Sequence, residues 1–402
     1  MTYPFASIEQ AIIELQEGRM VILVDDEDRE NEGDLVIAAQ HASAQAINFM
    51  SRFGRGLICL PMASELIDKL GLPMMAQNNR SPFGTAFTIS IEAATGVTTG
   101  ISAQDRARTV QTAIQADSGP ADVISPGHVF PLRALDGGVI KRAGQTEGSV
   151  DLVRLAGLTP AAVICEIINE DGTMSRRDEL LAFSKEHSIP VASIKDLIEY
   201  RIRNEALVEA IATSRVPLHQ RGDFAMTVFS NQIDDCEHFV LVKEPLFSNK
   251  VPLVRIHSEC ITGDVFGSCK CDCGSQLQQS LDLIGDEGGI LIYLRQEGRG
   301  IGLANKLKAY ALQEQGYDTV DANVQLGLPV DSRDYAVAFQ ILKYLGVDTV
   351  RLLTNNPYKV DAIIQYGINV SERISLSVEP TNENRAYLKT KQEKLGHLLA
   401  IE

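Results

Sequence analysis

Short apolar runs and helical stripes follow one another along the first half of this chain. A run that is apolar throughout suits a strand buried on both faces, whereas a helix buries only one stripe of its surface. The expected strands are residues 20–24, 35–39, 56–60, 87–91 and 163–167. The expected helices are one between Ser7 and Gly18, then 43–53, about 65–70, and one starting near Ser102. This alternation is typical of an α/β domain.

The second half continues the alternation after a change of pattern. Residues 196–210 carry a helical stripe, and the junction is expected within 203–215, with the boundary placed between 206 and 207. A hairpin is expected from 224–230 and 238–243, followed by strands 251–256 and 289–294 around a helix that begins after Gly274. A further helix follows Gly302, and the spacing of Leu303, Leu307 and Tyr310 places Tyr310 in the core. We therefore predict two mixed-sheet α/β (α+β) domains in tandem, 1–206 and 207–402.

The composition is that of an ordinary globular protein, with 45% hydrophobic and 22% charged residues. A formal net charge of −16 argues against general binding to nucleic acid or to an anionic membrane. Any phosphorylated substrate must therefore be held by local groups of Arg, Lys and backbone N–H. The N-terminus, Met1-Thr-Tyr-Pro-Phe5, lacks a signal-peptide pattern, and the most apolar stretch, 155–168, is too short to span a bilayer. We expect a cytoplasmic protein.

Three thiols lie close together in the second half, at Cys260, Cys271 and Cys273, with C-x10-C-x-C spacing. Cytosolic thiols stay reduced, and a soft thiolate trio suits Zn²⁺. Three protein ligands leave the fourth tetrahedral position for water, which is the pattern of a catalytic zinc site. The alternative is a closed structural site with a fourth ligand, for which Cys269, His257 and Glu259 are within the same stretch.

Two other segments of the second half carry candidate chemistry. Residues 295–302, Arg-Gln-Glu-Gly-Arg-Gly-Ile-Gly, form a turn with three glycines and two arginines before a helix, which favours binding of a triphosphate. Asp331-Ser-Arg-Asp334 is expected to open a helix, where acidic residues are ordinary capping groups. Lys359, after the Asn355-Asn-Pro turn, is one more candidate phosphate contact.

In the first half, residues 25–34 carry seven carboxylates in ten positions between two apolar strands. Such a run is usually a solvated loop. So much negative charge at a sheet edge is nevertheless costly unless a cation neutralises part of it, and oxygen ligands favour Mg²⁺ or Mn²⁺. His128, at the mouth of a strand, is by itself more often structural than catalytic. Glu166 lies inside an apolar run and needs a partner or a proton.

Taken together, the segments Arg255-Ile-His-Ser-Glu-Cys260, Cys271-Asp-Cys-Gly274, 295–302, Asp331–Asp334 and Thr354-Asn-Asn-Pro-Tyr-Lys359 closely resemble GTP cyclohydrolase II. The resemblance implies hydrolysis of GTP to 2,5-diamino-6-(ribosylamino)-4(3H)-pyrimidinone 5'-phosphate, formate and pyrophosphate, with zinc at the guanine C8 and Mg²⁺ at the triphosphate. It implies zinc ligation by Cys260, Cys271 and Cys273. The implied GTP contacts are Arg255, Ile256, His257, Ser258, Glu259, Gln276, Glu297, Gly298, Arg299, Thr319, Thr354 and Lys359.

The same resemblance assigns Asp331 as proton acceptor and Arg333 as nucleophile. A guanidinium stays protonated near pH 7, so we interpret Arg333 as a charge stabiliser.

The first half, through about residue 200, resembles 3,4-dihydroxy-2-butanone 4-phosphate synthase. The shared segments are Asp-Glu-Asp-Arg-Glu-Asn-Glu-Gly-Asp, Gly-Val-Thr-Thr-Gly, Pro-Gly-His-Val-Phe-Pro-Leu-Arg and Asp-Gly-Thr-Met. The resemblance implies conversion of ribulose 5-phosphate to the butanone phosphate and formate with Mg²⁺ or Mn²⁺. It implies a metal ligand at Glu30 and an acid/base pair, His128 and Glu166. The implied contacts to the sugar phosphate are Arg29, Glu30, Asp34, Arg142, Ala143, Gly144, Gln145 and Thr146.

Gln145 departs from the synthase pattern, Arg-x-Gly-His-Thr-Glu, in which the His is a metal ligand. An amide oxygen can still ligate Mg²⁺, but it supplies no imidazole and no titratable group. We therefore predict a weakened synthase half.

A fusion of the two families stands at the entry to riboflavin biosynthesis, and both families imply homodimers. The alternatives are a GTP cyclohydrolase II with a scaffolding N-terminal domain and a non-catalytic, zinc-stabilised nucleotide-binding protein.

Overall fold

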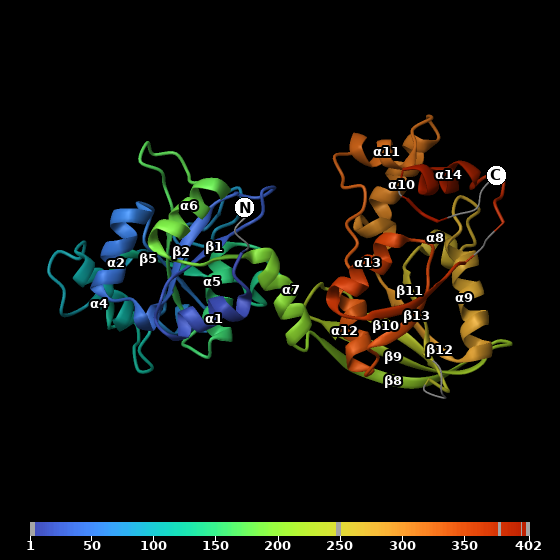
Figure 1. Ribbon diagram of the computed structural model, residues 1–402, viewed down its shortest axis with the longest axis horizontal. Coiled ribbons are helices and arrows are strands. Elements are labelled where there is room, and N and C mark those ends of the chain that lie inside the picture. The colour runs from blue at the N-terminus through green and yellow to red at the C-terminus, as the bar shows by residue number, and fades with distance from the viewer. Residues whose placement is uncertain (1–4, 247–250, 377–378, 395, 399–402) are drawn as a thin grey trace. The chain divides into compact units, whose positions relative to one another are not determined.

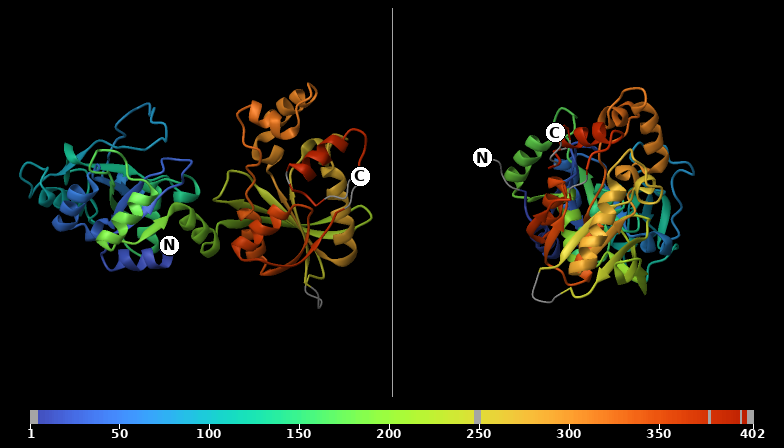
Figure 2. Two further views of the ribbon diagram at one scale, coloured as in Figure 1. Left: turned by 45° about the horizontal axis from the view of Figure 1, so that its top comes forward. Right: turned by 90° about the vertical axis from the view of Figure 1, so that its right-hand side faces the viewer.

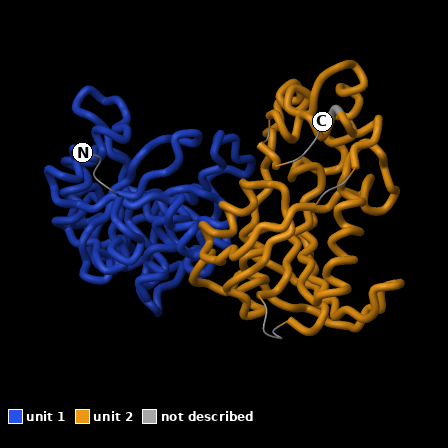
Figure 3. The backbone as a smooth tube through the Cα atoms, turned by 45° about the vertical axis from the view of Figure 1, so that its right-hand side comes forward, with its two compact units in different colours: residues 1–201 blue, residues 202–402 orange. Residues whose placement is uncertain are grey.

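The chain divides into two compact units, residues 1–201 and 202–402 (Figure 3). The computed structural model describes residues 5–246, 251–376, 379–394 and 396–398. The division falls inside helix α7 (Ile194–Asn204), and the predicted boundary between 206 and 207 lies in the short segment that follows this helix. Each unit contains one seven-stranded mixed sheet with helices, which confirms the predicted fold class.

The sheet of unit 1 has the strand order β4-β5-β3-β6-β2-β1-β7. Two neighbouring pairs, β1 with β7 and β3 with β5, are parallel, and the others are antiparallel. The strands are β1 (Val21–Val24), β2 (Gly33–Ala38), β3 (Cys59–Met62), β4 (Ile91–Ala93), β5 (Val123–Arg133), β6 (Ala162–Glu166) and β7 (Val191–Ser193).

Helices cover both faces of this sheet (Figure 1). Alternate residues of β1 join two different hydrophobic cores, Ile22 with one and Val21 with the other, because successive side chains of a strand point to opposite faces. The first core includes residues of α2 (Ala44–Phe49), α4 (Ala103–Ala113) and α6 (Arg177–His187). The second includes residues of α1 (Ile8–Gln16), α5 (Gln145–Leu155) and α7. The short α3 (Ser64–Lys69) follows β3.

The sheet of unit 2 has the order β14-β13-β11-β12-β10-β9-β8 and is parallel at one end and antiparallel at the other. The pairs among β14, β13, β11 and β12 are parallel, and the rest are antiparallel. The strands are β8 (Val208–Leu218), β9 (Gly222–Asn231), β10 (His238–Lys243), β11 (Leu253–Ser258), β12 (Gly289–Leu294), β13 (Thr349–Leu353) and β14 (Asn369–Ile374).

The helices of unit 2 fall into two groups. Leu281 and Ile284 of α9 (Cys273–Glu287) pack in a core with residues of β9 to β13, whereas α10 (Gly302–Gln313), α11 (Thr319–Gln325) and α14 (Arg385–Glu393) gather beyond one end of the sheet (Figures 1 and 2). The others are α8 (Ile261–Asp264), α12 (Ala336–Tyr344) and α13 (Pro357–Tyr366). No helix in the described ranges is long and apolar enough to cross a membrane.

The predicted helix 196–210 is wrong in its last residues. Helix α7 ends at Asn204, and β8 begins at Val208. The buried Gln340 donates to the carbonyl of Glu205 at 2.9 Å and accepts from the N–H of Leu207 at 2.9 Å. These bonds satisfy the backbone outside the helix, so a tertiary contact overrides the local stripe.

Two other expected elements also differ. The segment 87–91 forms only isolated bridges, through Phe87 and Thr88, before the short β4. Asp331 opens no helix, because α12 begins at Ala336, whose N–H donates to Asp334 at 2.5 Å.

Candidate active sites

Three parallel strands of unit 2 end at one cavity, and the sequence motifs lie at or directly after their ends. Strand β11 leads into Cys260, β12 into Arg295 and β13 into Thr354. The carboxyl ends of parallel strands meet at one edge of a sheet, which is where open α/β folds bind ligands. The cavity at this edge is lined by residues from these three segments and from α9, α10, α11 and α14.

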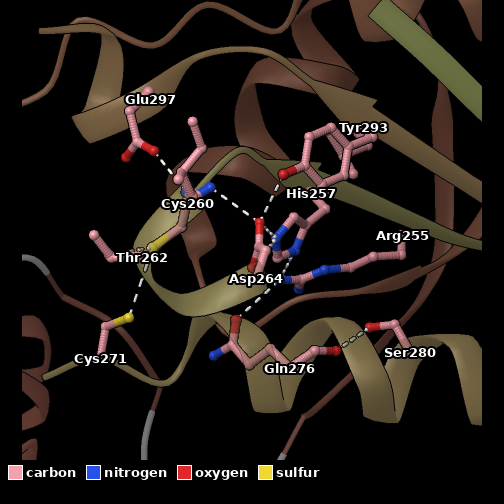
Figure 4. Close-up of polar contacts among 12 residues, drawn as sticks. Arg255, His257, Cys260, Thr262, Asp264, Cys271, Gln276, Ser280, Tyr293 and Glu297 are labelled. Carbon is pink, nitrogen blue, oxygen red and sulfur yellow. Dashed lines mark hydrogen bonds and ion pairs between the residues drawn. The ribbon is translucent and has the colours of Figure 1, made fainter. Parts of the chain in front are cut away.

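The three thiols converge at this cavity. The sulfurs of Cys260, Cys271 and Cys273 all lie within 4.8 Å of one another, and those of Cys260 and Cys271 are 3.6 Å apart (Figure 4). Gly263 makes the approach possible, since a Cβ atom there would lie 2.9 Å from the sulfur of Cys271. Hydrogen bonds from Cys271 and Cys273 lower the pKa of Cys260, so its sulfur is the first of the three to ionise.

Within the described ranges, no fourth Cys, His, Asp or Glu joins this cluster. Cys269 is exposed, and its sulfur is 4.0 Å from the carbonyl of Gly267. His257 is engaged elsewhere, because its Nε2 lies 3.0 Å from Asp264. The described residues therefore bring together three candidate ligands at the wall of the cavity.

Asp264 joins the thiol cluster to strand β11. Its Oδ2 accepts from the backbone N–H of Cys260 at 3.0 Å, from the hydroxyl of Tyr293 at 2.8 Å and from Nε2 of His257 (Figure 4). Burial lowers the pKa of His257, and Arg255 donates to its Nδ1 at 3.4 Å. A neutral His257 protonated on Nε2 satisfies both contacts.

Lys306 of α10 lies between the thiols and the glycine-rich turn. Its Nζ is 3.0 Å from the sulfur of Cys260, 3.0 Å from Thr262 Oγ1 and 2.8 Å from Glu297 Oε1. Burial alone would lower the pKa of Lys306, but the hydrogen bonds to Glu297 and Cys260 raise it, so this ammonium stays charged. Glu297 also accepts from the N–H of Ile261 at 2.6 Å and thereby fixes the start of α8.

The glycine-rich turn adopts left-handed backbone conformations. Gly298, Arg299 and Gly300 have φ of 62°, 62° and 88°. Two features disfavour a side chain at Gly300. Its positive φ is strained for other residues, and a Cβ would lie 2.5 Å from the hydroxyl of Ser332. Ser332 in turn donates from its N–H to the carbonyl of Arg299 at 3.1 Å. The turn is thus held against the segment that carries Asp331 and Arg333.

Positive charge dominates the wall of the cavity. Arg255 and Lys359 are buried, and their hydrogen-bond partners in the described part of the chain are neutral groups. Burial lowers the pKa of Arg255 to about 10, and burial together with the charges of Arg255 and Arg333 lowers that of Lys359. Arg299 carries a buried NH1 without a hydrogen-bond partner. Buried cations without counter-charges favour a polyanionic ligand.

Most of the predicted GTP contacts line this cavity. They are Arg255, His257, Ser258, Glu259, Gln276, Glu297, Gly298, Arg299, Thr319, Thr354 and Lys359. Ile256 is buried beside it and accepts from Lys359 Nζ at 2.7 Å through its carbonyl. Arg333 lines the cavity and forms an ion pair with Asp331, which lowers the pKa of this carboxyl against the effect of burial.

The sequence placed Tyr310 in the core, and this expectation is wrong. Its ring lines the cavity, with the ammonium of Lys306 5.8 Å from the ring centroid, while Leu307 of the same predicted stripe is 50% exposed. The spacing of Lys306 and Tyr310, four residues apart on one helix face, was the available signal. Tyr387, Lys391 and His397 also line the cavity, and no motif marked them.

In unit 1, the acidic loop leads from β1 into β2. Arg29 NH1 lies 2.7 Å from Asp25 Oδ2 and donates to Gln145 Oε1 at 3.1 Å, and its NH2 is 3.1 Å from Glu30. Asp34 pairs in register with Glu166 across β2 and β6. Burial and the neighbouring carboxylates, Glu166 first, raise the pKa of Asp34. Arg29 therefore neutralises part of the charge at this edge, while Asp34 is surrounded by other carboxylates.

The start of α5 forms a second feature of this site. Gly144 lies between two guanidinium groups, since a Cβ there would be 2.4 Å from Arg142 NH1 and 2.9 Å from Arg29 NH2. Residues Gln145 and Thr146 begin the helix, whose N-terminus has no side-chain cap, and Ala143 is exposed. Two arginines beside free helical N–H groups suit a phosphate.

The structure does not join His128 to Glu166 by a hydrogen bond or ion pair among the residues it describes. His128 Nδ1 lies 2.8 Å from Glu92 Oε2, and the other oxygen of Glu92 is buried without a partner. Glu166 instead accepts from the N–H of Leu57 at 2.8 Å.

Known proteins resemble the chain over its whole length. The 3,4-dihydroxy-2-butanone 4-phosphate synthase family profile matches residues 9–200, and that of GTP cyclohydrolase II matches 209–375. A riboflavin biosynthesis protein RibBA of Aquifex aeolicus is 50% identical over 400 residues, 98% of each chain, and that of Bacillus subtilis is 52% identical over 398 residues, 98% of this chain and 99% of that one. The chain belongs to the bifunctional riboflavin biosynthesis family RibBA.

As a RibBA family member, the chain carries both enzymes predicted from its motifs, the synthase in unit 1 and the cyclohydrolase in unit 2. The fold agrees with a solved relative. RibBX of A. baumannii, a two-domain 3,4-dihydroxy-2-butanone 4-phosphate synthase, is 36% identical with a TM-score of 0.69, covering 93% of this chain and 100% of that one.

Proposed function

We propose that Cys260, Cys271 and Cys273 hold the Zn²⁺ ion of the GTP cyclohydrolase reaction. Three convergent thiols form the soft donor set that zinc prefers, and three protein ligands leave a position for water. The bound ion supplies the activation of water for attack at C8 of the guanine ring. The thiol cluster beside a cation-lined cavity is the observation that carries this proposal.

The triphosphate of GTP, with its Mg²⁺, binds along the cationic wall. Arg255, Arg299 and Lys359 supply charge for which the described residues provide no ion pair. The left-handed turn at Gly298–Gly300 lets the backbone approach the phosphates. Binding of the polyanion thus relieves the cost of burying these cations.

Asp331 and Arg333 act together at the cleavage that releases pyrophosphate. Asp331 is ionised at neutral pH, so it accepts a proton. Although burial opposes it, the interactions of Arg333 with Tyr335 and with the carboxylate of Asp331 raise its pKa, and the guanidinium keeps its proton. We therefore assign Arg333 to stabilising negative charge that develops in the transition state, not to nucleophilic attack.

In unit 1, ribulose 5-phosphate binds with its phosphate at Arg29, Arg142 and the start of α5. Glu30 holds Mg²⁺ or Mn²⁺, and Asp34 beside it contacts the substrate. Burial raises the pKa of Glu30 and Asp34, and a nearby cation would offset that cost. The ion supplies stabilisation of the enediolate. His128, oriented by Glu92, and Glu166 move the protons.

Gln145 weakens this metal site. Its amide oxygen, the atom expected to ligate the ion, accepts from Arg29 at 3.1 Å, and its buried Nε2 is a donor without a partner. An N–H donor facing the site repels a cation. We infer a synthase activity below that of a chain with His at this position.

We also propose a homodimer in a reducing compartment, the cytoplasm, which suits seven free cysteines.

Formate release from GTP by the purified zinc-loaded chain tests the central proposal. We expect release that stops on chelation of zinc and returns on its addition. Cys271→Ser should lose zinc and activity, and Cys269→Ser, outside the cluster, should keep both. Zinc binding with no formate release would instead favour a nucleotide-binding protein without catalysis. Light scattering of the same sample measures the dimer.

A further inference from the structure

Helix α14 lies outside the segment matched by the GTP cyclohydrolase II profile, which ends at residue 375. This helix and the residues after it nevertheless contribute Tyr387, Lys391 and His397 to the cavity wall. Of these, Lys391 makes the contact with the clearest consequence for the thiol cluster.

Lys391 forms a buried ion pair with Asp272, which lies between two of the thiols in the sequence. Its Nζ lies 2.6 Å from Oδ1 of Asp272, the residue between Cys271 and Cys273, and both side chains are buried. The other carboxylate oxygen of Asp272 accepts from Gln276 Nε2 at 2.6 Å. Asp272 therefore ties the thiol-bearing turn at once to α14 and to α9.

The hydrogen bonds continue from Gln276 into the cavity. Gln276 Oε1 accepts from Arg255 NH2 at 2.9 Å (Figure 4). Arg255 NH1 donates to the carbonyl of Leu353 at 3.0 Å. One chain of contacts thus runs from the C-terminal helix past the thiols to the end of β13. A charge removed at Lys391 would leave Asp272 buried without its cation, which forces that carboxylate to move and the thiol-bearing turn with it.

Other contacts hold α14 in place without Lys391. Leu388 is buried, Lys394 is 3.4 Å from Asp321, and the N–H of Leu398 donates to the carbonyl of Asn355 at 2.9 Å. Substitution of Lys391 therefore tests the ion pair and leaves the anchors of the helix intact.

We propose that Lys391 is a positioning residue of the GTP cyclohydrolase site, which holds Cys271 and Cys273 in the geometry for zinc through Asp272. The inference rests on the proposed zinc site. Outer partners that orient metal ligands commonly contribute ~10–100-fold to metal affinity or activity.

The test compares Lys391→Met with Lys389→Met, a matched change on the same helix at an exposed lysine. Zinc affinity is measured by competition with a chelator, and kcat and KM for GTP are measured at saturating zinc. We expect Lys391→Met to bind zinc ~10–100-fold more weakly and to lose kcat with little change in KM. Lys389→Met should match the native protein, and Lys391→Arg should recover part of the loss.

A double change separates this role from simple misfolding. Asp272→Asn removes the buried charge that Lys391 neutralises, so Lys391→Met should cost less zinc affinity in that background than in the native one. Equal losses in both backgrounds, or native zinc affinity in Lys391→Met with a raised KM alone, would overturn the inference. Absence of zinc binding and formate release in the native chain would overturn the proposed function as well, so the two failures are distinguishable.

Discussion

The ammonium of Lys306 lies 3.0 Å from the sulfur of Cys260 and 2.8 Å from Glu297. A cation that hydrogen-bonds a thiolate draws electron density from the sulfur, so a metal held by that sulfur, as proposed, would be a stronger Lewis acid. One lysine thus connects the thiol cluster with the glycine-rich turn.

Lys306→Met should therefore lower kcat for GTP by ~10–100-fold. The pH at which the rate reaches half its maximum should rise, because a weaker Lewis acid activates water only at higher pH. Lys308→Met, on an exposed part of the same helix, is the control. A native pH profile in Lys306→Met would contradict this role.

Gln145→His should raise formate release from ribulose 5-phosphate by ~10–100-fold with Mg²⁺ present, because imidazole restores the metal ligand that the family pattern has here. Gln145→Leu, of similar size and without donor or acceptor, should not. Equal rates in the native chain and the His variant would mean that the amide suffices. If neither releases formate, residues other than 145 are responsible.

Gly300→Ala should raise KM for GTP and destabilise unit 2. Its φ of 88° is strained for alanine, and the new methyl would lie 2.5 Å from Ser332 Oγ. Gly316→Ala is the matched control, with φ of 100° and no atom within 4 Å of its added Cβ. Both variants carry backbone strain of about 1 kcal/mol. A difference between them in KM for GTP therefore reports the contact with Ser332, which only Gly300→Ala makes.

Asp234 should give unit 2 a stability that depends on acid pH. Burial would raise its pKa, but hydrogen bonds from His238 and Asn231 outweigh burial and lower the pKa to about 2 from 3.8. Because the carboxyl has a lower pKa in the folded than in the unfolded state, its ionised form stabilises the folded state above about pH 4. This contribution is lost as the pH falls through about 2.

Denaturant unfolding at pH 5 should show Asp234→Asn less stable than the native protein by about 1–2 kcal/mol, allowing for solvent screening. The difference should shrink toward pH 2. Asp361→Asn, exposed on α13, should show no such dependence. A pH-independent gap for Asp234→Asn would refute the electrostatic explanation.

The sequence predicts best where its signals are local. The apolar runs at 20–24 and 289–294 are strands because their side chains are buried on both faces, and the thiol spacing is short enough for the sulfurs to meet. Residues 207–210 could not be assigned in this way. Gln340 accepts from Leu207, 133 positions away, and donates to Glu205, and these hydrogen bonds hold the backbone just after the end of α7.

The candidate sites show the same division. The family resemblance grouped the motif segments at the ends of β11, β12 and β13 in one site, and they meet because these parallel strands align their carboxyl ends. The direction of the Gln145 amide could not be predicted, because a hydrogen bond from Arg29, in a loop far away in sequence, sets it. Lys391 carries no motif, and only tertiary structure places it beside Asp272.

The pairing of Lys391 with Asp272 also sets an order of events during synthesis. Residue 391 follows residue 273 by 118 positions, so at about 5–20 residues per second the ribosome makes the three thiols and Asp272 roughly 6–24 s before the lysine that pairs with Asp272. During that interval the nascent chain carries Asp272 without its cation and without the contact to α14. The proposed zinc site would therefore be complete only after α14 has been translated.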